Sequence, residues 1–166
     1  DERFVIQFMR DGLVFSCVSK YEDWATFRNA AEDVWRVYVD LAKPIETQRL
    51  GVRFINQIAD ATPTNVQDFL REPPVRPANL SLNDFVYQST LNVPGHPYRV
   101  RIIKAMQYAL PGFQQISGLF VDVDVFSTTS LSHDADALNE ALTHMRWFKN
   151  KVFFNLLTDA AIESFK

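Results

Sequence analysis

The charged residues best placed to act together lie in three strand-like runs of the sequence. In the run from 119 to 126, apolar residues alternate with Asp122 and Asp124, and side chains two positions apart in a strand share a face. The same alternation puts arginines on polar faces of two other runs, which completes the set Arg49, Arg53, Arg99, Arg101, Asp122 and Asp124. Arginine forks bind carboxylates and phosphates. The set therefore predicts either a solvated sheet face with cross-strand ion pairs or a binding surface for an anionic group or a partner.

The sequence contains no recognisable catalytic, metal or cofactor motif. Its histidines, His96, His133 and His144, do not have metal-ligand spacing, and neither a histidine nor a third acid lies near Asp122 and Asp124 in the sequence. There is no Gly-x-Ser-x-Gly elbow, and five glycines cannot build a glycine-rich phosphate loop. We therefore expect a protein that is not an enzyme and that holds no cofactor and no metal.

Composition limits the remaining classes of function. The chain has 166 residues, 47% of them hydrophobic, which suits one packed domain over residues 1–166. Its net charge is −3 with acids and bases interleaved, which argues against nucleic acid as a partner, and no apolar run is long enough for a membrane span. The single cysteine, Cys17, fits a buried thiol in a reducing compartment, so we expect a cytoplasmic protein. Because the chain begins at Asp1 without a methionine, we also expect a fragment that lacks an N-terminal segment.

A hairpin and a helix are predicted for the first third of the chain. Residues 4–9 and 13–18 are rich in strand formers and are joined by Arg10-Asp11-Gly12, which predicts a tight turn with positive φ at its central residues. Residues 19–22 match a capping box with Ser19 as the cap. The helix that follows ends before Pro44 and carries one apolar stripe, made of Trp24, Phe27, Ala31, Val34, Tyr38 and Leu41.

The rest of the chain reads as four strands and a long helix. Residues 49–58 form the third strand, and a proline-rich connection over 59–79 contains a short helical segment at 65–70. Strands at 80–93, 98–109 and 116–128 are separated by turn residues and should pair consecutively and antiparallel. The last helix starts near residue 134, is capped by Ser132 or Asp134, and is followed by a short final turn.

This order of elements predicts an α+β domain rather than a doubly wound sheet. We expect an antiparallel twisted sheet of about six strands, in the order ββ-α-β-βββ-α, packed on two helices. That order resembles helix-grip and TATA-protein-like folds, in which a twisted sheet wraps a long C-terminal helix.

The sequence over 50–58, LGVRFINQI, resembles a strand motif, L-G-[LV]-R-[YF]-I-N-x-I, of a sporadically distributed family of uncharacterised prokaryotic proteins. Residues 21–27 and 149–154, with Thr158 and Asp159, are similar to a helix start and to the C-terminal helix of that family. The match covers most of the chain and falls in the later two-thirds of the family's length. The resemblance implies no catalytic residues, and the patchy distribution implies an accessory role such as defence or another horizontally moved system.

Two polar residues of this motif are expected to have separate roles. Alternation puts Arg53 and Asn56 on opposite faces of the strand, with Asn56 on the apolar face beside Val52 and Phe54. Because a buried amide must be hydrogen-bonded, we interpret Asn56 as a structural anchor.

These patterns predict a non-catalytic binding or interaction module, accessory to a prokaryotic defence or regulatory system, with a protein or a small ligand as its partner. The alternative is a small-ligand pocket protein or an unrecognised enzyme, with its cavity between the sheet and the C-terminal helix near Trp147 and Phe153. A filled core at that place would favour the interaction module.

Overall fold

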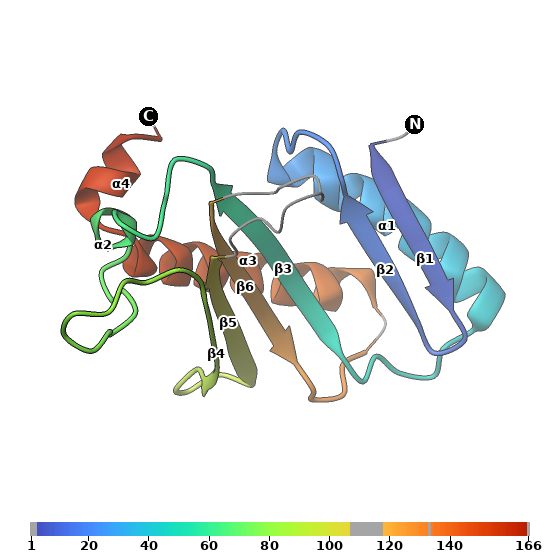
Figure 1. Ribbon diagram of the computed structural model, residues 1–166. Helices are drawn as coiled ribbons and strands as arrows, with labels where there is room; N and C mark the ends of the chain where they lie inside the picture. The colour runs from blue at the N-terminus through green and yellow to red at the C-terminus, as the bar shows by residue number, and fades with distance from the viewer. Residues whose placement is uncertain (1–2, 107–117, 133, 166) are drawn as a thin grey trace.

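The computed structural model describes residues 3–106, 118–132 and 134–165 of the chain. It confirms an α+β architecture with antiparallel strands (Figure 1). In chain order the elements are β1 (Phe4–Met9), β2 (Gly12–Cys17), α1 (Trp24–Ala42), β3 (Leu50–Ile58), α2 (Val66–Phe69), β4 (Phe85–Asn92), β5 (Tyr98–Met106), β6 (Leu119–Ser127), α3 (Ala135–Leu156) and α4 (Asp159–Glu163).

The six strands are divided between two sheets rather than joined in one. Strands β3, β6, β5 and β4 form a four-stranded antiparallel sheet in that order, and β1 and β2 pair only with each other in the described residues. The predicted consecutive pairing of β4, β5 and β6 is confirmed. Strand β3, however, joins the free edge of β6, and this pairing between distant parts of the chain places β6 in the interior of the sheet.

The core lies between the four-stranded sheet and α3. Both long helices lie behind the strands in Figure 1, and α3 crosses the sheet over β3 and β6. Every second residue of β6 points to α3 and has no exposed surface: Leu119, Val121, Val123 and Val125. Met145 of α3 is equally buried against them. Strands β3 and β5 cover the two edges of β6, and α3 covers one of its faces. Together they exclude solvent from this row of side chains.

Helix α1 begins one turn later than the capping-box pattern predicts. Its N-cap is Asp23, whose carboxylate accepts a hydrogen bond from the backbone N–H of Thr26 at 2.9 Å, so the prediction of Ser19 as the cap is wrong. The predicted stripe is buried at Trp24 and Tyr38, but Leu41 at its end is 76% exposed.

The β1–β2 hairpin forms as predicted but with different turn chemistry. Met9 pairs with Gly12, which leaves Arg10 and Asp11 as the two loop residues. Neither loop residue has a positive φ, so the predicted positive-φ turn is not what closes the hairpin. The inner face of the hairpin packs on α1 through aromatic contacts such as Phe8 with Tyr38, at 6.0 Å between ring centroids.

The proline-rich connection packs against the end of the chain. Its short helix α2 was predicted, and the fully buried Leu70 follows it directly. Backbone hydrogen bonds join Phe69 to Thr158 and Arg71 to Leu156, both at 3.0 Å. Strand β4 starts at Phe85, so the strand predicted from residue 80 begins five residues later than expected. The predicted ends of β5 and β6 at residues 107–109 and 116–117 lie outside the described residues.

Candidate functional site

The predicted charged residues meet on the face of the four-stranded sheet that points away from α3, called the open sheet face below. Strand β6 lies between β3 and β5, and Asp124 is level with Arg53 on one side and Arg101 on the other. Asp124 Oδ2 accepts hydrogen bonds from Arg101 Nη2 at 2.9 Å and from Arg49 Nη2 at 3.1 Å. One carboxylate thus joins arginines from both neighbouring strands.

The second carboxylate, Asp122, binds Arg53 in a fork. Arg53 Nε and Nη2 donate to the two carboxylate oxygens of Asp122 at 2.9 and 2.6 Å. This hydrogen bonding raises the pKa of the Arg53 guanidinium above its ordinary value, with burial acting in the opposite direction. A bidentate pair fixes the plane of the guanidinium as well as its position.

The carboxylates of the open sheet face are buried, whereas its arginines are half-exposed. Asp122 and Asp124 are 7% and 3% exposed, but the side chains of Arg49 and Arg53 remain 53% and 50% exposed. The expected cross-strand ion pairs are present, but the expectation of a solvated face is wrong for the aspartates. The arginine side chains lie over the carboxylates and present their outer surfaces to solvent.

Arg99 is on the same face but outside this network. It is level with Phe126 of β6 and Asn92 of β4, it is exposed, and it makes no ion pair with a described residue. The structure thus brings together Arg49, Arg53, Arg101, Asp122 and Asp124 and leaves Arg99 unpaired beside them.

Sequence reasoning missed several neighbours of these charges. Arg49 stacks on the ring of Phe126 at 4.8 Å, and Gly51 lies beside both. A Cβ at Gly51 would sit 3.1 Å from Phe126 Cβ and 3.4 Å from Asp124 Oδ1, so any side chain there would require Phe126 to move by a few tenths of an ångström. A glycine inside a strand pattern is the sequence signal for such close approach. Exposed Ile55 and Val86 add apolar surface to the same face.

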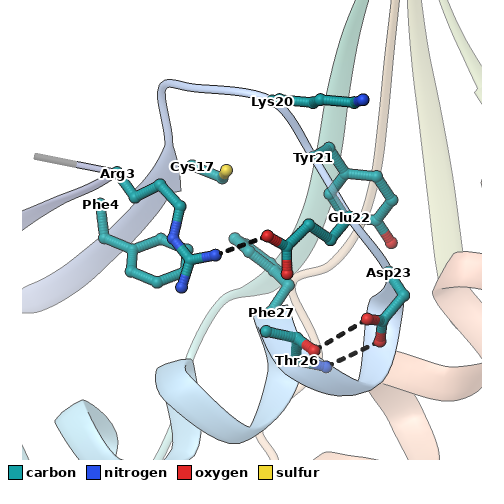
Figure 2. Close-up of a pocket in the computed structure, with 9 residues that line it drawn as sticks. All are labelled: Arg3, Phe4, Cys17, Lys20, Tyr21, Glu22, Asp23, Thr26 and Phe27. Atoms are coloured by element: carbon teal, nitrogen blue, oxygen red, sulfur yellow. Dashed lines mark hydrogen bonds and ion pairs between the residues drawn. The ribbon is translucent and has the colours of Figure 1, made fainter. Parts of the chain in front are cut away.

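The hollow beside the start of α1 is too small for a ligand (Figure 2). It encloses about 10 Å³, close to the minimum that holds one water molecule. Its lining includes Cys17, whose thiol contacts the Ser19 carbonyl at 3.6 Å, and an ion pair between Arg3 and Glu22 at 2.8 Å. Hydrogen bonds from Thr26, its backbone N–H first, lower the pKa of the capping Asp23. A second depression is lined only by consecutive residues of the loop 76–81.

The space proposed for an alternative ligand cavity is filled. Met145 packs on the sheet with no exposed surface, and Phe148 and Phe153 pack against the same core. Trp147 points away from the core and is exposed. His96 packs against both Tyr98 and Phe148, with ring centroids 5.9 and 4.8 Å away, so its surroundings are those of an aromatic cluster.

The remaining predicted polar positions have simple structural surroundings. Asn56 Nδ2 donates to the Val121 carbonyl at 3.1 Å from the core side of β3, in agreement with its interpretation as a hydrogen-bonded anchor. His144 is exposed and His133 lies outside the described residues. Within the described parts of the chain, no three His, Cys, Asp or Glu residues come together in a way that could hold a metal ion.

Comparison of the chain with protein-family models, with curated proteins and with solved structures found no match. No helix among the described residues is long and apolar enough to cross a membrane.

Proposed function

We propose that this chain is a non-catalytic interaction module that docks an acidic protein partner on the open sheet face. The observation that carries the proposal is the placement of half-exposed arginines over buried carboxylates, on a face that no described helix covers. Side chains that are already fixed lose less conformational freedom when a partner binds. Arginine also offers a planar fork to the carboxylates of a partner.

The charge of the open sheet face supports an acidic partner. Four arginines and two aspartates give this face an excess of two positive charges, although the whole chain has a net charge of −3. Such local complementarity speeds encounter and selects partners. The exposed side chains of Ile55 and Val86 supply apolar contact area next to the charges.

The biological setting rests on the sequence resemblance. The family that the strand motif resembles is sporadically distributed among prokaryotes, which supports an accessory role in a defence or regulatory system. The single cysteine supports a place in the cytoplasm, where thiols stay reduced. The alternative of a small-ligand pocket or an enzyme depends on a cavity beneath α3. The packing of Met145 and Phe153 on the sheet gives that alternative no support.

The test is a comparative capture experiment with the chain immobilised and exposed to a nuclease-treated extract of its native cells. The variant Arg99→Glu reverses the unpaired charge on the open sheet face and disturbs no ion pair of the described residues. Arg10→Glu, in the exposed hairpin turn, makes the same change in net charge elsewhere. We expect a partner captured equally by the parent and Arg10→Glu, and captured at least about tenfold less by Arg99→Glu, because interface arginines carry much of the binding energy.

Two further variants separate binding from folding. Arg53→Ala and Arg101→Ala each remove one fork from the open sheet face, and thermal unfolding followed by circular dichroism reports whether they remain folded. Equal capture of every partner by folded Arg53→Ala, Arg99→Glu and Arg101→Ala would contradict the proposal.

A further inference from the structure

Lys149 of α3 is a buried cation without a counter-ion among the described residues. It lies four residues after Met145 on the side of α3 that faces the sheet, and it is only 8% exposed. Its Nζ lies 3.7 Å from the centroid of the Phe54 ring, on the core side of β3. Burial first, and the charge of Arg146 second, lower the pKa of Lys149 from 10.5 to about 8.

Arg146 is a second cation in the same place. It precedes Lys149 by almost one helical turn, and its guanidinium carbon lies 5.5 Å from the ring centroid of Trp24 at the start of α1. Neither cation makes an ion pair or a hydrogen bond with a described residue. Two like charges at this spacing on one helix face repel each other.

The carboxylates nearest in sequence to this part of α1 have other partners. Asp23 caps α1 through Thr26, and Glu22 pairs with Arg3. Strands β3 and β6 pack against α3. Their charged residues are Arg53, Asp122 and Asp124, and the side chains of all three point away from α3, to the open sheet face. The Arg146–Lys149 pair therefore has no internal anion to neutralise it among the described residues.

The surroundings of the pair are aromatic and partly open to solvent. Tyr21 packs edge-on against Phe54, with ring centroids 5.2 Å apart, and its side chain is exposed on the outer side. Burial raises the pKa of the Tyr21 hydroxyl above its ordinary value; the charge of Arg146 acts against this rise, and the charge of Asp23 adds to it. The rings of Trp24 and Phe54 compensate the two cations only in part, because ring faces attract cations more weakly than a carboxylate does.

We propose that Arg146 and Lys149 bind a single oxyanionic group, a carboxylate or a phosphate, between the aromatic walls of Trp24 and Phe54. The group would supply the counter-charge that the two cations lack among the described residues, since Asp23 and Glu22 beside them have other partners. Neither cation lines either of the two hollows described above, so the proposed site is separate from both. It lies across the sheet from the open sheet face and is independent of the protein partner proposed for that face.

The experiment follows the pKa of Lys149 by NMR in protein with isotope-labelled lysine. The resonance is assigned from its loss in Lys149→Met, and titrations are compared in inorganic phosphate, acetate and sodium chloride at equal ionic strength. We expect phosphate, acetate or both to raise the Lys149 pKa from about 8 toward its ordinary value of 10.5 in a saturable manner, because a bound anion favours the charged amine. Whichever anion acts identifies the group that the site accepts.

Variants of α3 test whether the two cations act together. Arg146→Gln should weaken the anion's effect at least about tenfold, whereas Arg146→Lys should retain it because the charge remains. Lys151→Met is the matched control, since Lys151 is an exposed lysine of the same helix lying over Trp147. An unchanged Lys149 pKa in both anions, an equal rise in sodium chloride, or full anion binding by Arg146→Gln would each overturn the proposal.

Discussion

The two faces of the four-stranded sheet differ in whether a buried charge has an oppositely charged partner. On the open sheet face, Asp122 and Asp124 are almost fully buried, and each accepts hydrogen bonds from at least one arginine. On the opposite face, which α3 covers and which is called the covered face below, Lys149 is similarly buried, and the ring of Phe54 is its partner in the part of the chain that the structure describes. Burial alone therefore does not set the cost of a charge. The cost depends on whether an opposite charge is buried with it.

The largest expected loss of stability comes from the packing of α3 against the sheet. Met145→Ala should lower the free energy of unfolding by about 2–5 kcal/mol, because it removes a fully buried side chain against β6. Urea unfolding measures the change. A loss below that of an ordinary surface substitution would mean that α3 does not seal this face, and the contrast between the two faces would fail.

Removing a buried carboxylate should be the next largest change. Asp124→Ala should cost about 1–3 kcal/mol, because it leaves Arg49 and Arg101 close together without their shared partner. The half-exposed arginines can turn to water, which keeps the cost below that of a fully buried pair. Asp33→Ala is the control, since Asp33 pairs with Arg36 on the exposed side of α1 and should cost under about 1 kcal/mol. Equal losses for the two variants would show that burial of Asp124 does not matter.

The opposite sign is expected on the covered face. Lys149→Met should raise the free energy of unfolding by about 1–2 kcal/mol at neutral pH, because a flexible apolar side chain replaces an unpaired buried cation. Since the pKa of Lys149 is lowered from 10.5 to about 8, the unfolded chain binds more protons than the folded one between these values. The parent should therefore gain stability as the pH rises through that window, and the advantage of the variant should disappear.

Denaturant unfolding of both proteins from about pH 7 to about pH 9.5 checks this pH dependence. The raised pKa values of Tyr21 and Tyr98 act in the other direction above their ordinary range, and they act equally in parent and variant. A constant difference between the two proteins across the window would contradict an unpaired, desolvated Lys149.

The smallest expected effect is at the unpaired arginine of the open sheet face. Arg99→Ala should change stability by less than about 0.5 kcal/mol. Arg53→Ala should cost about 1–3 kcal/mol, because it leaves the buried carboxylate of Asp122 without its fork. The cost of Arg53→Ala should also shrink in high salt. If Arg99→Ala lowered the free energy of unfolding more than Arg53→Ala does, Arg99 would have to make a stabilising contact of its own.

Sequence periodicity was enough to group the charges of the open sheet face, but it could not position them. The alternation in β6 puts Asp122 and Asp124 on one face wherever the strand pairs. Two of their arginine partners, Arg49 and Arg53, depend on the pairing of β3 with β6, two strands separated by sixty residues, whereas Arg101 lies on β5, whose pairing with β6 was predicted. No local pattern specifies such a pairing, and so the burial of the aspartates beneath the arginines could not be predicted.

The buried position of Lys149 could have been found from the spacing of the apolar residues in α3, but the predicted stripe did not include it. The apolar positions Leu138, Leu142, Met145 and Val152 leave a gap where the next buried residue of α3 should fall, and Lys149 fills that gap. A charged residue at a position that periodicity assigns to the core is a reason to look for an anion.

The displaced cap of α1 has a different cause. Ser19 and Asp23 both precede the helical pattern with suitable side chains, so the local sequence alone does not choose between them.

The division of the strands into two sheets has a consequence for how the molecule opens. Every backbone group of β6 that takes part in the ladder is held between β3 and β5, whereas β1 and β2 have only each other among the described strands. Amide protons of β6 should exchange with solvent only when the whole domain unfolds, and those of the hairpin should exchange through brief local opening. The aromatic inner face of the hairpin, with Phe8 and Phe15, is exposed during each such opening. The hairpin is thus the part of the chain where proteases and self-association would act first, long before the sheet that carries the paired charges loosens.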